Sequence, residues 1–246
     1  MIKLKDILFE GVNDPGIFKA IFIAGGPGSG KTYIAKQLFG IPERYNISMT
    51  GLKMINSDKE LKYLLNKYGF GTELDKMPDE LFKDLTGAGG SGLRKFSKEL
   101  TAQRMKLYKQ GRLGMIIDGT GHDFSKIHAM KKDLEKDGYD TYMTFVNTSL
   151  EVAQKRNQGR DRILPPELLE KSWKDVQQNL GSFQSLFGNQ NFLLIDNSSY
   201  LNAKQAQSKF SILVSKHIKK FISKPIKNTI AKRWIAKQQI LKKQGK

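Results

Sequence analysis

The sequence predicts an α/β fold in three layers, with helices on both faces of a mainly parallel sheet of five strands. Five short apolar runs recur along the chain, and helix-like segments separate them. Such runs, rich in β-branched and aromatic residues, are typical of parallel strands buried on both faces. Strands that alternate with helices favour a parallel sheet, because a crossover between parallel strands needs a long connection. No internal repeat is present.

The expected elements follow this alternation along the chain. Strands are expected at 20–24, 52–58, 113–118, 141–147 and 191–197. Helices are expected at 4–10, 33–39, 59–68, 79–85, 93–110, 126–136, 150–160 and 166–180. The chain then divides into a leader with one helix and a turn (1–18), one α/β domain (19–202) and a basic helical extension (203–246).

Composition restricts the class of protein. The chain has 246 residues, of which 39% are hydrophobic and 27% are charged, and this suits a globular protein. No apolar run approaches the roughly 18 residues that span a bilayer, and the first residues alternate charged and apolar side chains too often for a signal peptide. Because there is no cysteine, disulfides, thiolate nucleophiles and cysteine-ligated zinc are excluded. We therefore expect a cytoplasmic protein.

The turn after the first expected strand has the form G-x-x-x-x-G-K-T. Its glycines allow the backbone to fold tightly and to direct N–H groups at phosphate oxygens, beside the positive end of the next helix. The spacing predicts that Lys31 reaches the β- and γ-phosphates of ATP and that the Thr32 hydroxyl ligates Mg²⁺. A chance match is the alternative, but the strand before the turn and the helix after it disfavour one. The residues expected to bind the nucleotide are Gly25, Gly26, Pro27, Gly28, Ser29, Gly30, Lys31 and Thr32.

Two acids follow later strands. Asp118 comes after four apolar residues, the position of an acid that holds the Mg²⁺ shell, although it could instead cap an Asp-Gly turn. Asp58 is expected to end the second strand. Because ligands of open α/β sheets bind outside the carboxyl ends of the strands, both acids should face one crevice. There Asp58 could act as a general base toward an attacking hydroxyl, or it could merely cap the helix that begins at Lys59.

Three arginines, Arg156, Arg160 and Arg162, follow the fourth strand. The first two are four residues apart, so a helix presents both on one face. Such a cluster could spread over the γ-phosphoryl group and neutralise the charge that develops during transfer. A solvated basic helix face is the alternative, and Asp161 could also pair with either neighbouring arginine.

The order of these motifs resembles the polynucleotide 5′-kinase and zeta-toxin group of P-loop kinases, over roughly residues 19–197. The resemblance implies the P-loop NTPase fold, with ATP and Mg²⁺ as cofactors. It implies that Asp58 is the general base and that Asp118 is the acid near the metal. It also implies that Arg156 and Arg160 are lid arginines on the phosphates.

The sequence departs from that group on the acceptor side. Polynucleotide kinases place an arginine three residues after the base to grip the substrate's phosphate, and here that position is Leu61. Lys62 is not equivalent, because an ammonium cannot form the planar fork of a guanidinium. The segment between residues 39 and 52 is also longer than is usual in the group. These departures leave the acceptor open.

The extension carries most of the net charge of +18. Residues 203–246 contain 13 Lys or Arg and no Asp or Glu, whereas the rest of the chain has 29 basic and 24 acidic residues. Apolar residues recur with helical spacing over about 203–222 and again after Pro225. We expect the first stripe to dock on the core. The second could follow a nucleic-acid backbone without base specificity or, less favourably, lie on an anionic membrane.

These observations predict an ATP-dependent phosphotransferase that acts on a hydroxyl, at a nucleic-acid 5′-end or on a nucleotide-like molecule. One alternative is a nucleotide-binding module that its basic tail anchors to nucleic acid or to an assembly. Another is a toxin-like kinase of nucleotide sugars. The second acid and the arginines favour an enzyme, because a binding module needs neither. A G-x-G-x-x-G match at 87–92 follows a helix rather than a strand, so we interpret it as a loop that could close over the substrate.

Overall fold

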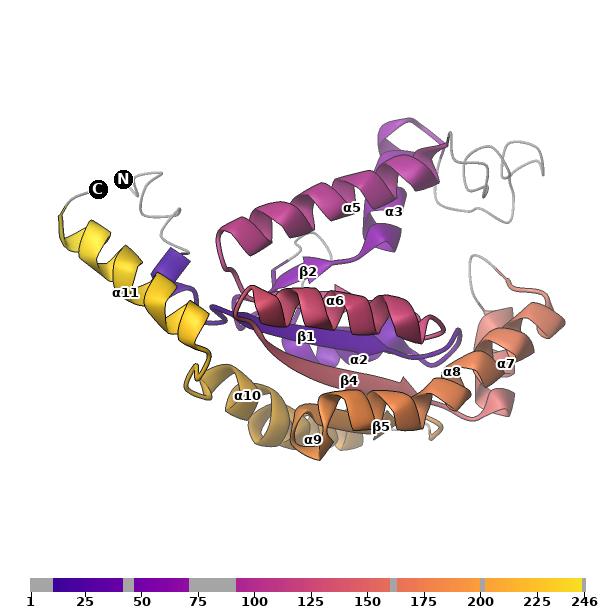
Figure 1. Cartoon of the computed structure of the whole chain (residues 1–246). Helices are drawn as coiled ribbons and strands as arrows, with labels where there is room; N and C mark the ends of the chain where they lie inside the picture. Colours follow the sequence, from indigo (N-terminus) through magenta and orange to yellow (C-terminus); the bar gives the residue numbers. More distant parts are fainter. Residues whose placement is uncertain (1–10, 42–46, 71–91, 160–162, 200–201, 245–246) are drawn as a thin grey trace.

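The computed structural model describes residues 11–41, 47–70, 92–159, 163–199 and 202–244, and their backbone forms one sheet with helices on both faces (Figure 1). The five strands lie in the order β2-β3-β1-β4-β5, and every neighbouring pair is parallel. The predicted fold class is therefore confirmed. The strands are β1 (Lys19–Ala24), β2 (Lys53–Ile55), β3 (Met115–Asp118), β4 (Asp140–Asn147) and β5 (Phe192–Asp196).

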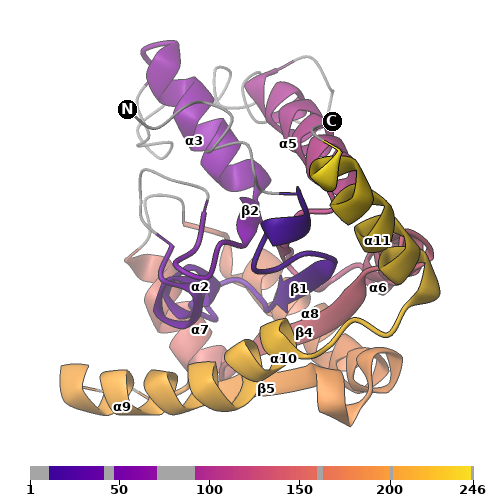
Figure 2. The ribbon, with the colours of Figure 1, turned by 90° about the vertical axis from the view of Figure 1, so that its left-hand side faces the viewer.

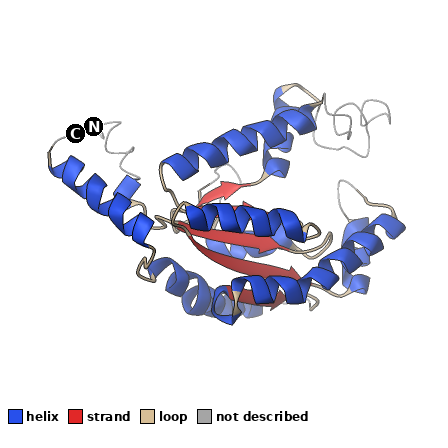
Figure 3. Ribbon diagram, in the orientation of Figure 1, coloured by secondary structure: helices blue, strands red, loops and turns tan. Residues whose placement is uncertain are grey.

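The helices alternate with the strands, as Figure 3 shows. Those before β5 are η1 (Gly11–Asn13), α2 (Lys31–Phe39), α3 (Ser57–Lys67), α5 (Leu93–Gln110), α6 (Phe124–Lys136), α7 (Leu150–Gln158), α8 (Pro166–Phe187) and η3 (Asn189–Asn191). Those after β5 are α9 (Ala203–Leu213), the π-helical turn η4 (Val214–Lys219), α10 (Lys220–Ser223) and α11 (Thr229–Lys243). The helices expected at 4–10 and 79–85 lie outside the described residues.

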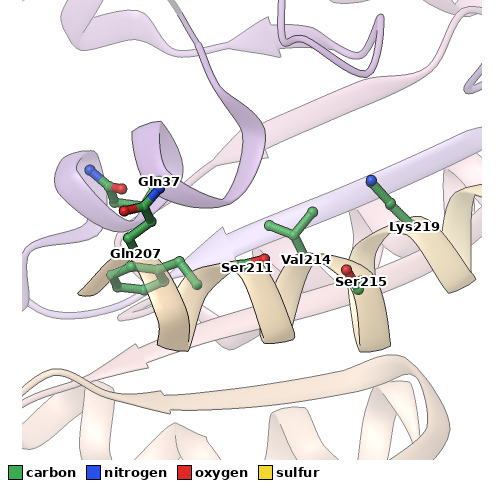
Figure 4. A pocket seen from close by; sticks show the side chains of 7 residues that line it. Gln37, Gln207, Ser211, Val214, Ser215 and Lys219 are labelled. Carbon is green, nitrogen blue, oxygen red and sulfur yellow. The ribbon is translucent and has the colours of Figure 1, made fainter. Parts of the chain in front are cut away.

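Two hydrophobic clusters form, one on each face of the sheet, because side chains alternate along every strand. On one face Ile21 and Ile23 of β1 pack with α2 and with the helices α9 to α10. On the other face Ala20 and Phe22 pack with α6 and α8. Figure 2 views the sheet from its amino end and shows α9 and α10 lying beneath it. Between α2 and α9–η4 there remains an open hollow of about 250 Å³, lined by Gln37, Gln207, Phe210, Ser211, Val214, Ser215 and Lys219 (Figure 4).

Two predicted boundaries are wrong by three residues or more. Helix α8 continues to Phe187 rather than ending at Leu180, because Phe183 and Phe187 are buried in the second cluster and extend its apolar stripe. Strand β2 ends at Ile55 rather than at Asp58. The Asn56 side chain accepts the backbone N–H groups of Asp58 (2.8 Å) and Lys59 (3.3 Å), and this cap starts α3 two residues earlier than expected.

Both parts of the C-terminal extension pack on the core. The first does so through Phe210, Ile218 and Phe221, as expected. Helix α11 also packs, at the amino end of the strands: the Trp234 ring lies 5.5 Å from the Phe18 ring, edge to face. The buried Ala231 of α11 lies close to Gly138: a Cβ atom added to Gly138 would be 3.2 Å from the Ala231 Cβ. Among the described residues, no helix combines the length and apolar character that a membrane span needs.

Candidate active site

The loop between β1 and α2 has the tight backbone that its glycines predict. Gly28 and Gly30 have φ values of 75° and 81°, in the left-handed region that favours glycine. A Cβ on Gly28 would lie 2.7 Å from the Ala153 Cα, and one on Gly30 would lie 2.5 Å from the Asn197 Nδ2. In the described part, no side chain caps the amino end of α2, which leaves its positive end for an anionic ligand.

Three neighbouring elements hold this loop in place. The Asn197 amide, just after β5, donates to the Ser29 carbonyl at 2.8 Å. Arg156 of α7 reaches the carbonyls of Gly28 and Ser29 at 3.4 and 3.5 Å, which places its guanidinium against the loop. The Lys31 ammonium folds back onto the Gly25 carbonyl at 2.7 Å. The loop is therefore preformed, with cations on two of its sides.

Asp118 ends β3 beside this loop, as predicted. Its Oδ2 accepts a hydrogen bond from the Asn56 amide at 2.8 Å, while its Oδ1 is buried and has no hydrogen-bond partner among the described residues. Burial raises the pKa of Asp118 to about 6, an effect that the Lys31 ammonium opposes and the Asp58 carboxylate strengthens. The three groups thus share one electrostatic environment.

These residues fit a bound Mg²⁺ of the kind that P-loop proteins use. A buried carboxylate oxygen without a partner is a costly arrangement unless a cation or an ordered water satisfies it. The described residues contain no group of three or more acidic or histidine side chains that could hold a metal by themselves. Thr32, Asp118 and phosphate oxygens of the nucleotide are the donors that such a Mg²⁺ would use here.

Asp58 lies in the first turn of α3, and its side chain is 79% exposed. The strand-end position predicted for it is therefore wrong, and so is the alternative that it caps α3, because Asn56 is the cap. Its Oδ1 instead accepts a hydrogen bond from the Arg94 guanidinium at 2.6 Å. The carboxylate is consequently exposed to solvent at the amino end of α3, where a substrate can reach it.

Arg94 comes from the first turn of α5, which packs along α3. An ion pair between Arg104 and Glu60 also joins these two helices. Leu61 is 5% exposed, so the position three residues after Asp58 faces the interior rather than solvent. Helix α3 contains no arginine, and the guanidinium beside Asp58 comes from Arg94 of α5 instead.

The structure brings together only part of the predicted set. Lys31 and Asp58 lie close enough to Asp118, at the end of β3, for their charges to shift its pKa, and Arg156 lies against the loop at the Gly28 carbonyl. Arg160 and Arg162 lie outside the described residues, as does most of the glycine-rich segment at 87–92.

Sequence reasoning missed Asn56, Arg94 and Asn197. For Asn56 a signal existed, since Asn before Ser-Asp at the start of a helix pattern is typical of a cap. The other two contacts join residues that are far apart in the chain, and no local pattern marks them.

No protein-family model matches the chain, and no curated protein matches it. Solved structures are similar to it. A gluconokinase from Sinorhizobium meliloti 1021 is 14% identical, with a TM-score of 0.42 over 81% of this chain and 95% of that one. A putative kinase from Chloroflexus aurantiacus j-10-fl is 12% identical, with a TM-score of 0.48 over 81% and 97%.

A chain of the PezAT toxin–antitoxin system of Streptococcus pneumoniae is 11% identical, with a TM-score of 0.47 over 84% of this chain and 88% of that one. The similar structures thus include proteins described as kinases. At identities of 11% to 14%, these likenesses do not extend to an acceptor.

Proposed function

We propose that the chain is an ATP-dependent phosphotransferase that moves the γ-phosphate of ATP to a hydroxyl acceptor. The observation that carries this proposal is the position of Lys31, Asp118 and Asp58 at or after the carboxyl ends of the neighbouring strands β1, β3 and β2, with Asp58 exposed toward solvent. A nucleotide-binding loop needs the first two groups. Nucleotide binding does not require a further exposed carboxylate. Transfer to a hydroxyl does require one, as a general base.

The nucleotide side follows from the loop. Backbone N–H groups of the loop and the Lys31 ammonium would hold the phosphates of ATP, and the Arg156 guanidinium adds positive charge behind them. Thr32 and Asp118 would hold Mg²⁺, and the bound ion would neutralise the charge of the phosphates. Asn56 orients the Asp118 carboxylate through its hydrogen bond at 2.8 Å.

The acceptor side follows from Asp58. Its carboxylate would take the proton of the attacking hydroxyl as the new O–P bond forms; the bond from the γ-phosphorus to the β–γ bridging oxygen breaks, and ADP leaves. The ion pair with Arg94 does not block this role, because exposed pairs are weak. A substrate can displace it at little cost.

Arg94 also indicates what kind of acceptor fits. A guanidinium binds phosphate oxygens in a planar, two-pronged geometry. An acceptor whose hydroxyl lies near a phosphate can therefore use Asp58 and Arg94 together. Nucleic-acid 5′-ends, nucleotide-like molecules and nucleotide sugars all have this chemistry. We favour a nucleic-acid 5′-end or a nucleotide-like molecule, with a nucleotide sugar as the second candidate.

The test is transfer of label from γ-³²P-ATP to a panel of acceptors: 5′-hydroxyl DNA, 5′-hydroxyl RNA, nucleoside 3′-phosphates and nucleotide sugars. We expect labelling of at least one acceptor. Asp58→Asn should reduce that transfer by roughly 10²–10⁴-fold, the scale of a lost general base, while ATP·Mg²⁺ binding by calorimetry stays near the wild-type value.

The matched control is Asp133→Asn, since Asp133 is an exposed acid on α6 that pairs with Lys109. It should leave transfer unchanged. No labelling of any acceptor, together with intact ATP·Mg²⁺ binding, would instead identify a nucleotide-binding module.

A further inference from the structure

We propose that the C-terminal helices form a binding surface for the sugar–phosphate backbone of a polynucleotide. We define the C-terminal cationic surface as ten residues that are all exposed: Lys204, Lys216, Lys219, Lys220, Lys224, Lys227, Lys232, Arg233, Lys237 and Lys243. None of the ten forms a salt bridge with another described residue. This surface does not depend on phosphotransfer for its function.

The extension differs from the core surface because no acidic residue lies beside its cations in the sequence. On the core surface, Lys109 pairs with Asp133 and Asp137 at 2.5 and 2.9 Å. Residues 203–246 contain no Asp or Glu, and the fold brings no described acid of the core within salt-bridge distance of the ten. Like charges gathered in this way repel one another, so a polyanion gains affinity wherever it neutralises them.

The surface extends across the molecule. Near its beginning, the Lys209 ammonium donates to the Asp196 carbonyl at 3.1 Å, which places α9 beside the carboxyl end of β5. At the end of α10, the Lys224 carbonyl accepts from Lys19, the first residue of β1, at 2.8 Å. The helical segment from α9 to α10 is roughly 30 Å long at about 1.5 Å per residue, and α11 continues around the amino end of the sheet (Figures 1 and 2). A surface this long fits a polymer better than a mononucleotide.

An anionic membrane fits less well, because the apolar faces of these helices are already in use. A helix that lies on a membrane buries its apolar face in lipid. Here Phe210, Phe221 and Ala231 are buried in the protein, and Trp234 packs on Phe18. Among the described residues of the extension, the large apolar side chains left exposed are three separate isoleucines, Ile212, Ile230 and Ile240. Helix α11 also turns away from the line of α9 and α10 (Figure 2), so a flat bilayer cannot follow both, whereas a flexible polynucleotide can.

The chemistry of the surface indicates binding without sequence preference. Nine of its ten cations are lysines, which act as point charges on phosphates rather than as planar readers of bases. The aromatic residues of the extension, Phe210, Phe221 and Trp234, pack inward and so cannot stack on bases. Phosphate contacts remain as the source of affinity.

Point substitutions test this surface better than a deletion does. Removing residues 224–246 would take away Trp234 and the carbonyl that Lys19 uses, and so would disturb the core. We would compare Lys216→Gln/Lys219→Gln/Lys220→Gln with Lys232→Gln/Arg233→Gln/Lys237→Gln. The matched control is Lys126→Gln/Lys132→Gln/Lys171→Gln, which removes three exposed lysines from α6 and α8. Circular dichroism would show that all three variants are folded.

The measurement is fluorescence anisotropy of a labelled 20-nucleotide single-stranded DNA, without ATP, at several salt concentrations. Each triple variant of the surface should lower the log–log salt slope by about 2, at about 0.7 per lost phosphate contact. The control should keep the wild-type slope, and homopolymers of thymine and adenine should bind alike. Slopes that stay unchanged in both surface variants would overturn the proposal. Binding to phosphatidylserine vesicles but not to DNA would overturn it too, and would assign the surface to a membrane. Because no ATP is present, neither result bears on the phosphotransferase.

Discussion

The two ends of the sheet use charged residues in opposite ways. At the carboxyl edge, charged groups lie near the nucleotide loop, and two of them have polar neighbours: Lys31 the Gly25 carbonyl, Arg94 the Asp58 carboxylate. At the amino end, the pair of Lys53 and Asp14 lies inside the protein, and the buried ammonium of Lys19 pairs with the partly exposed Asp140. Lys232, Arg233 and Lys237 of α11, which form no salt bridge with another described residue, lie on the outside. In our proposal, charge at the first edge binds a small anionic ligand, whereas at the second edge charge stabilises the fold inside, and the outer cations named above have no described acid beside them.

Asp14 is the clearest example of an internal charge. Its carboxylate has no exposed surface and accepts from the Lys53 ammonium, from the Gly16 N–H at 2.8 Å and from the Gly114 N–H at 3.1 Å. It thereby ties the turn before β1 to the start of β2 and to the residue before β3. A carboxylate satisfied in this way contributes to the structure and not to chemistry.

The largest effect that this contrast predicts concerns Lys31. Lys31→Ala should abolish ATP·Mg²⁺ binding at concentrations that saturate the wild type, because the phosphate charge loses its main cation, while the thermal transition stays near that of the wild type. Isothermal titration calorimetry and differential scanning calorimetry measure the two properties. Lys36→Ala, on the exposed side of the same helix, is the control. Normal ATP binding by the Lys31 variant would refute the nucleotide assignment.

Asp14→Ala should give the next largest effect, and on stability rather than binding. Removing one partner of a buried ion pair leaves an uncompensated ammonium, and such changes cost about 3–5 kcal/mol. Urea denaturation would measure the loss in the free energy of unfolding. For contrast, Lys237→Gln on the outer face of α11 should change it by less than about 0.5 kcal/mol. Equal effects of the two substitutions would remove the distinction between internal and external charges at the amino end.

A smaller effect is expected for Arg94. If this guanidinium binds a phosphate of the acceptor, Arg94→Ala should raise the KM for the acceptor by about 10- to 100-fold, the value of a charge-assisted hydrogen bond of roughly 1.5–3 kcal/mol. The KM for ATP should not change. Arg94→Lys should recover only part of the loss, because lysine lacks the planar fork. A reduced kcat with an unchanged KM for the acceptor would show that Arg94 instead positions Asp58.

Much of the fold could be predicted because its signals are local. Each strand is an apolar run, and the loop motif stands between the first strand and its helix, so β1 and α2 follow directly from the sequence. The boundary at Asp58 was missed because a cap formed by Asn56 overrides the continuing strand pattern. The length of α8 was missed because it depends on the burial of Phe183 and Phe187 against other elements.

Within the site, only the residues that a local sequence motif marks could be predicted. Lys31 and Asp118 are fixed by their position after buried strands, and both lie where the pattern places them. Arg94 could not be found, because its contact with Asp58 requires α5 to lie along α3, and nothing in either helix specifies that pairing. The roles given to Arg160 and Arg162 remain predictions.

The contact between Lys19 and residue 224 affects when β1 can complete its folding during protein synthesis. The buried ammonium of Lys19 donates to a carbonyl that lies 205 positions further along the chain, besides its bond to Asp140. During synthesis on the ribosome, β1 therefore emerges long before the groups that satisfy it. Until residue 224 has emerged, the strand that leads into the nucleotide loop has a lysine without all of its native partners. We expect the nucleotide loop to become fully ordered only after that point, so that shorter nascent chains do not bind ATP.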